Sequence, residues 1–89
     1  MKKVHIFIYG NVIGVFFRAN VREKARALDL KGYVKNIDNK VEAVFEGSED
    51  KIREIIEFCK NPGFTEVDRV EVKEEHYKGE FDSFEIIYY

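Results

Sequence analysis

Aliphatic and ring-bearing side chains alternate at the start of the chain, which predicts a β-strand over residues 4–9. Its aliphatic side chains fall on one face and its ring-bearing side chains on the other (Val4, Ile6 and Ile8; His5, Phe7 and Tyr9). Apolar residues then recur at every third or fourth position from Phe17 to Leu28, which predicts a helix over residues 16–30. Gly32 follows, and we expect it to end this helix, because glycine is favoured just after the last turn.

Two short runs of β-prone residues, 33–37 and 40–46, predict an antiparallel hairpin. Asp38 and Asn39 separate the two runs, and both residue types tolerate the backbone geometry of a tight turn.

A second helix is predicted from Ser48, whose hydroxyl can cap the first turn, to Asn61-Pro62-Gly63, which ends it. Its first turn contains Glu49 and Asp50, whose negative charges interact favourably with the positive end of the helix dipole. Its apolar stripe consists of Ile52, Ile55, Ile56 and Cys59.

Residues 66–75 and 81–89 predict two further strands, joined by a connection longer than a minimal hairpin. The element order is therefore βαββαβ, with the last segment an added strand or part of a split one. Right-handed crossovers then give an α+β, ferredoxin-like sandwich, in which both helices cover one face of an antiparallel sheet.

Length and composition are those of one globular domain, residues 1–89. Hydrophobic residues make up 45% of the chain, which is too many for a disordered tail. A single cysteine excludes an intrachain disulfide, and the N-terminus lacks the apolar run of a signal peptide. No stretch approaches the roughly 20 apolar residues of a membrane span. We therefore expect a cytoplasmic protein that does not enter a membrane.

Charge is distributed unevenly along the chain. Residues 1–45 hold nine Lys and Arg against four Asp and Glu, a formal charge of +5, whereas residues 46–89 sum to −7. The basic half favours a small anionic substrate, and the acidic half disfavours a polyanion such as nucleic acid.

The segment between the first strand and the first helix predicts an anion site. Two glycines and Arg18 occur there, where backbone N–H groups and a helix N-terminus converge. The candidate donors are the N–H groups of Asn11, Val12, Ile13, Gly14, Val15, Phe16 and Phe17. Because residues 10–18 contain no Cys, Ser, Thr, Asp or His, this loop has no side chain that could accept a phosphoryl group. A phosphate would be held there without transfer to the protein.

The same segment resembles the signature of the acylphosphatase family, Gly-x-Val-Gln-Gly-Val-x-Phe-Arg. The chain matches it at Gly10, Val12, Gly14, Val15, Phe17 and Arg18, and has Ile13 where the family has glutamine. The resemblance continues through residues 32–36, 41–47 and 79–88. It implies a metal-independent and cofactor-free enzyme that hydrolyses small acyl phosphates to a carboxylate and inorganic phosphate by direct attack of water.

The resemblance also implies the two catalytic residues. Arg18 would pair two phosphate oxygens with its guanidinium, and Asn36 would orient the attacking water while a substrate phosphate oxygen accepts its proton. Local sequence alone leaves plainer interpretations open. Arg18 is otherwise a surface arginine on a helix, and Asn36 a strand-end residue that serves the adjacent turn.

The other polar candidates are interpreted as structural. His5 and His76 lack the spacing of a set of metal ligands, and Cys59 is the last residue of the apolar face of the second helix. Paired carboxylates occur at residues 74–75 and at 80 and 82, but the former point to opposite faces of a strand and the latter lack a third ligand. We expect no bound metal.

Two alternatives to catalysis remain to be weighed. Ferredoxin-like domains also bind RNA, but residues 39–45 lack the pattern of an RNA-recognition strand, so we set that function aside. The second is a degenerate acylphosphatase-like domain that binds phosphate or a partner with little turnover, for which Ile13 is the motivating feature. We expect a monomer, and the sequence motifs define the phosphate end of the substrate without specifying its acyl group.

Overall fold

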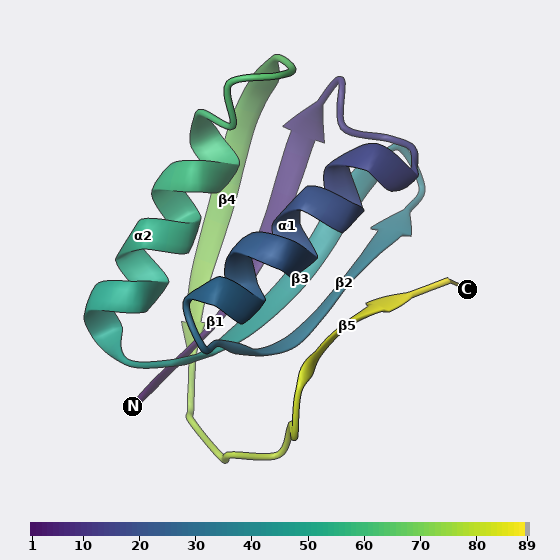
Figure 1. Cartoon of the computed structure of the whole chain (residues 1–89). Coiled ribbons are helices and arrows are strands. Elements are labelled where there is room, and N and C mark those ends of the chain that lie inside the picture. Colours follow the sequence, from purple (N-terminus) through teal and green to yellow (C-terminus); the bar gives the residue numbers. More distant parts are fainter. Residues whose placement is uncertain (89) are drawn as a thin grey trace.

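The structure, a computed structural model, describes residues 1–88, with the side chain of Val15 excepted, and consists of two layers (Figure 1). Five strands form one sheet, and two helices lie side by side on one of its faces. The elements are β1 (Lys2–Gly10), α1 (Val15–Ala27), β2 (Lys31–Ile37), β3 (Lys40–Gly47), α2 (Glu49–Lys60), β4 (Val67–Glu75) and β5 (Phe84–Ile87).

The strand order is β4-β1-β3-β2-β5, and the sheet is mixed. The pairs β1–β4, β1–β3 and β2–β3 are antiparallel, whereas β5 runs parallel to β2. The ferredoxin-like α+β architecture is confirmed, but the prediction of a wholly antiparallel sheet is wrong. Residues 76–83 cause the difference: they lead the chain from β4 at one edge to the opposite edge, where β5 pairs with β2 as an added strand (Figure 1).

The core lies between the sheet and the helices, and the register of β1 with β3 builds its centre. Val4 pairs with Phe45 and Ile8 with Val41, with Ile6 between them. All are buried, as the alternating pattern of β1 predicted. Each such side chain contributes about 1.5–3 kcal/mol by leaving water.

Helix α1 ends three residues earlier than its apolar spacing predicted, and Gly32 does not end it. Asp29 takes the left-handed conformation at φ 57°, so that its N–H donates to the Arg26 carbonyl and the Leu30 N–H donates to the Ala25 carbonyl, at 3.0 and 2.9 Å. This arrangement satisfies carbonyls of the last turn and turns the chain into β2. Gly32 lies within β2, where a Cβ would collide with the carbonyl oxygen of Val44.

Helix α2 begins after Ser48, as predicted, but the predicted capping bond is absent. The Ser48 carbonyl accepts the Ile52 N–H at 3.0 Å, while its hydroxyl makes no capping hydrogen bond to the first turn. Ile52, Ile55 and Cys59 form the buried side of this helix.

The other face of the sheet is partly covered by the connection between β4 and β5. The Phe81 ring packs edge-on against Tyr33, with the ring centroids 5.8 Å apart, and Lys3 Nζ lies 2.7 Å from a carboxylate oxygen of Glu80. Phe81 therefore belongs to this connection and not to the last strand, which begins at Phe84. Tyr89, the end of the predicted strand, lies outside the described residues.

Candidate active site

The connection between β1 and α1 is anchored to the start of β4. The Asn11 N–H donates to the Glu66 carbonyl at 3.0 Å, and the Thr65 hydroxyl donates to the Asn11 carbonyl at 2.6 Å. Gly10 permits this approach, because a Cβ in its conformation, φ 136°, would lie 2.7 Å from the Asp68 nitrogen and 2.8 Å from the Glu66 carbonyl oxygen. The loop is therefore held by backbone contacts that only glycine allows.

The N-terminus of α1 presents backbone donors without a capping side chain. Gly14 occupies the N-cap position at φ 114°, and the first turn contains no acidic residue. First-turn N–H groups have no intrahelical acceptor, and they carry the positive end of the helix dipole. The Val12 N–H is already used, since it donates to the Gly10 carbonyl at 2.9 Å. Among the predicted donors, Asn11 and Val12 thus fix the loop, and residues 13–17 remain as the candidates that face an anion.

Arg18 lies in the first turn of α1, and it is only 7% exposed. Its Nε donates to the Gly14 carbonyl at 3.4 Å, and its guanidinium carbon lies 5.3 Å from the centroid of the Tyr88 ring. Within residues 1–88, no carboxylate forms an ion pair with it. A buried guanidinium without a carboxylate partner is suited to an anionic ligand.

Asn36 lies near the carboxyl end of β2, and the loop follows the carboxyl end of β1. Asn36 pairs with Val41 of β3, and Val41 pairs on its other side with Ile8 of β1, two residues before Gly10. Because β1 and β2 run in the same direction on either side of β3, their carboxyl ends lie at the same end of the sheet. The Asn36 Oδ1 atom is buried and has no hydrogen-bond partner in the described part of the chain. It is thus an unused acceptor near the loop.

Several of the residues interpreted as structural are held by protein contacts. The His5 Nε2 atom lies 2.6 Å from a Glu42 carboxylate oxygen, and its Nδ1 atom lies 3.2 Å from a Glu75 carboxylate oxygen. Glu74, the neighbour of Glu75, accepts a hydrogen bond from Lys2 Nζ at 2.8 Å. Cys59 is fully buried, and burial raises the pKa of its thiol to about 12. No group of side chains in residues 1–88 has the arrangement of a metal site.

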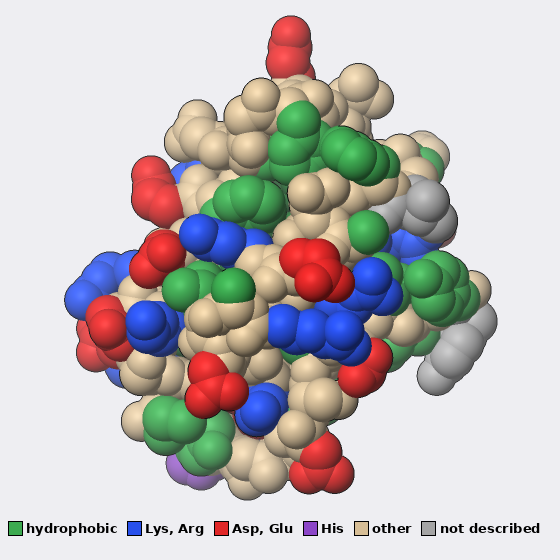
Figure 2. Space-filling model, viewed as in Figure 1, with side chains coloured by type: hydrophobic (Ala, Val, Ile, Leu, Met, Phe, Trp, Pro, Cys, Tyr) green, Lys and Arg blue, Asp and Glu red, His purple; other side chains and the backbone are tan. Residues whose placement is uncertain are grey.

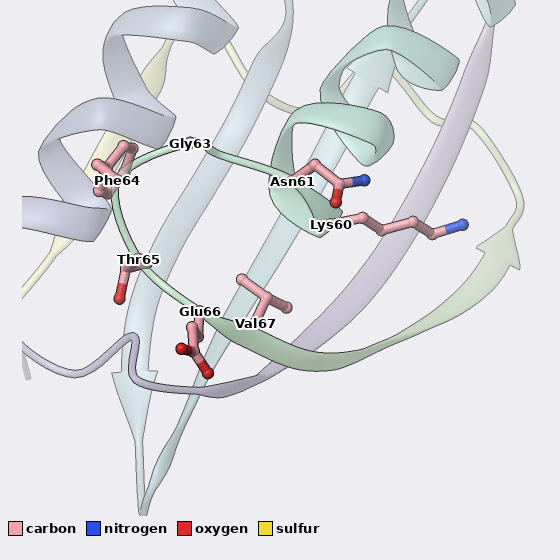
Figure 3. A pocket seen from close by; sticks show the side chains of 7 residues that line it. All are labelled: Lys60, Asn61, Gly63, Phe64, Thr65, Glu66 and Val67. Carbon is pink, nitrogen blue, oxygen red and sulfur yellow. The ribbon is translucent and has the colours of Figure 1, made fainter.

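Tertiary structure brings two further parts of the chain to this site. The segment between α2 and β4 anchors the loop through Thr65 and Glu66, and places the Phe64 ring beside α1 (Figure 3). Tyr88 reaches Arg18 from the end of β5. These residues lie more than 40 positions from the loop, and no local pattern marks them. Only the strand order could have revealed them.

Comparison with known proteins identifies the family. The family model described as Acylphosphatase matches residues 4–86. The chain is 44% identical over 90 residues to the acylphosphatase of Syntrophus aciditrophicus, covering 99% of this chain and 94% of the relative. It is 45% identical over 89 residues to that of Syntrophobacter fumaroxidans, covering 98% and 92%. The crystal structure of acylphosphatase from Bacillus subtilis superposes with a TM-score of 0.91 at 34% identity, covering 99% of this chain and all of that one.

Fold, loop and comparisons together define a small hydrolase that acts on phosphorylated carboxylates. The chain belongs to the acylphosphatase family, and its reaction is the hydrolysis of acyl phosphates. The comparisons do not favour the alternative of a degenerate domain. Ile13, the residue that motivated this alternative, carries an exposed side chain.

Proposed function

We propose that the substrate phosphate binds to the backbone N–H groups of residues 13–17 and to the guanidinium of Arg18. The observation that carries this proposal is the burial of Arg18, at 7% exposure, in the first turn of α1 without a carboxylate partner in residues 1–88. A phosphate dianion would supply the missing charge and accept two parallel hydrogen bonds from the guanidinium. Asn11 and Val12 support the loop through their backbone bonds.

Asn36 orients the attacking water in this proposal. Its buried Oδ1 accepts a hydrogen bond from the water, which places the water oxygen for in-line attack on phosphorus. The new P–O bond forms as the bond to the acyl oxygen breaks. The carboxylate leaves, and the water proton passes to a phosphate oxygen, so that inorganic phosphate is the second product.

Neither a protein nucleophile nor a metal is required for this chemistry. Residues 10–18 lack a side chain able to form a phosphoryl-enzyme. A carboxylate is a good leaving group and needs little protonation by a general acid, so that positioning and charge stabilisation supply most of the rate. Direct attack by water is therefore sufficient.

A hydrolysis assay tests the proposal. The purified chain is given acetyl phosphate in the presence of a chelator, and inorganic phosphate is added as an inhibitor. We expect turnover that the chelator leaves unchanged and that phosphate inhibits competitively, because product and substrate share the loop. Loss of activity with the chelator, restored by a divalent ion, would contradict the metal-free reaction. Inhibition that is not competitive would contradict the shared site.

The distribution of apolar and charged side chains bears on where the enzyme acts. No helix in residues 1–88 is long and apolar enough to span a membrane. The two helices carry interspersed Lys, Arg, Asp and Glu on the face shown in Figure 2, without a continuous basic surface for nucleic acid. We propose a cytoplasmic monomer that has no nucleic-acid or membrane partner.

A further inference from the structure

Two consecutive peptide groups in the loop before α1 have all their hydrogen-bonding groups occupied. In the first, the Asn11 N–H donates to the Glu66 carbonyl at 3.0 Å, and the Gly10 carbonyl accepts the Val12 N–H at 2.9 Å. In the second, whose N–H is that of Val12, the Asn11 carbonyl accepts the Thr65 hydroxyl at 2.6 Å. Hydrogen bonds therefore fix this stretch just before the candidate phosphate donors begin at residue 13.

Thr65 contributes the one bond of this set that comes from a side chain. It lies in the segment between α2 and β4, 54 positions from Asn11 in the sequence, and its side chain extends from this segment (Figure 3). The separation of 2.6 Å is at the short end of the range for O–H···O hydrogen bonds. Thr65 thus ties the loop to a distant part of the fold through a group that a substitution can remove.

The peptide held by Thr65 leads directly to the first candidate donor. A peptide group is planar, so fixing the Asn11 carbonyl also fixes the Val12 N–H on its other side. The Val12 side chain is buried in the core, which restrains the same stretch from below the loop. Further on, Gly14 has φ 114°, and a Cβ there would meet no heavy atom of residues 1–88 within 4 Å, its chain neighbours aside. The donors from Ile13 onwards therefore extend from a fixed peptide beside open space.

Loss of the Thr65 hydroxyl should affect phosphate binding more than folding. Thr65 is partly exposed, and its bond to Asn11 lies at the surface, so water can replace the hydroxyl on the carbonyl oxygen. Water satisfies the carbonyl but does not fix its direction relative to β4. Donors that are oriented before a ligand arrives bind it more tightly, because less ordering is needed on binding. A role in binding can therefore be separated from a role in folding.

We infer that Thr65 is a positioning residue of the phosphate site. Its hydroxyl holds the peptide between Asn11 and Val12, so that the backbone N–H groups of residues 13–17 are directed at the substrate phosphate before it binds. Thr65 acts through this peptide and not through a contact with the substrate. The inference rests on the proposed function, since it requires the phosphate to bind these N–H groups.

The test measures the inhibition constant of inorganic phosphate and the kinetics of acetyl phosphate hydrolysis. Thr65→Val removes the hydroxyl and keeps the branched shape, and it should raise both the inhibition constant and KM about three- to tenfold. The value of kcat should stay within about twofold of wild type, because the same N–H groups bind the phosphate of substrate and transition state. Thr65→Ser keeps the hydroxyl and should restore both constants.

Ser48→Ala is the matched control, because it removes a hydroxyl before the opposite end of α2 and should leave both constants unchanged. Urea unfolding midpoints are measured for each variant, and Thr65→Ala serves as a second hydroxyl-free variant if Thr65→Val does not fold.

Two results would overturn the inference. One is an unchanged inhibition constant in a folded variant without the hydroxyl, and the other is an equal rise in Thr65→Ser, which would show that the hydroxyl is not the determinant. Failure of phosphate to inhibit the wild-type chain competitively would instead contradict the proposed function.

Discussion

The Tyr88 ring covers the guanidinium of Arg18, with the guanidinium carbon 5.3 Å from the ring centroid. Such a contact favours the charged guanidinium and limits its rotation. Arg18 is thereby held from two sides, by the Gly14 carbonyl and by the last described residue of the chain. The tertiary structure thus brings Tyr88 to Arg18, 70 positions away in the sequence.

Tyr88→Ala should raise the KM for acetyl phosphate about two- to fivefold, because Arg18 loses its orientation while keeping its charge. Tyr88→Phe keeps the ring and should behave as wild type. Initial-rate kinetics on both variants provide the measurement. Equal losses in the two variants would show that the hydroxyl, and not the ring, is what matters.

Arg18→Ala should raise KM and lower kcat together, with kcat/KM falling about a hundredfold or more, since the guanidinium would contact both the bound phosphate and the more charged transition state. Arg22→Ala is the matched control, one turn further along α1, where the arginine pairs with the exposed Glu23 at 3.1 Å. It should keep wild-type kinetics. A folded Arg18→Ala variant with normal turnover would show that the loop is not the phosphate site.

Asn36→Ala should lower kcat about a hundredfold or more while leaving the inhibition constant of phosphate nearly unchanged, because the lost amide orients water and does not hold the phosphate. Asn39→Ala, in the adjacent turn, is the control and should retain kcat. Phosphate inhibition and urea unfolding are measured alongside. Parallel losses of phosphate affinity and stability in Asn36→Ala would instead indicate a structural turn residue.

Gly10→Ala should destabilise the fold by about 2 kcal/mol or more, because its Cβ would lie 2.7 Å from the Asp68 nitrogen and 2.8 Å from the Glu66 carbonyl oxygen, in addition to the cost of a positive φ. Gly63→Ala is the control. Its φ is 90° with open space around the Cβ, so it should lose only about 1 kcal/mol. Urea unfolding midpoints compare the two, and equal destabilisation would mean that the loop does not need the close approach.

Cys59 should not react with thiol reagents at neutral pH unless the chain unfolds, and activity should survive the treatment. Burial raises the pKa of its thiol from 9.0 to about 12, so the thiolate is scarce in the folded state. The unfolded chain loses this proton at lower pH than the folded chain, and stability should therefore fall as pH rises from 9 towards 12. Rapid labelling of the folded protein at pH 7 would contradict the burial of this side chain.

Local sequence predicted the order of the elements and the composition of the loop. The alternation in β1 and the apolar spacing in α2 depend on periods of two and 3.6 residues, which a short stretch displays by itself. The absence of a nucleophile between Gly10 and Arg18 is likewise a property of nine consecutive residues. These features could be predicted because each depends on neighbours along the chain.

Tertiary structure decided the rest. The parallel pairing of β5 with β2, the anchoring of the loop by Thr65 and Glu66, and the Tyr88 ring over Arg18 all join segments far apart in sequence. These contacts depend on which strands become neighbours and how closely their backbones pack, and local propensity carries no information about either.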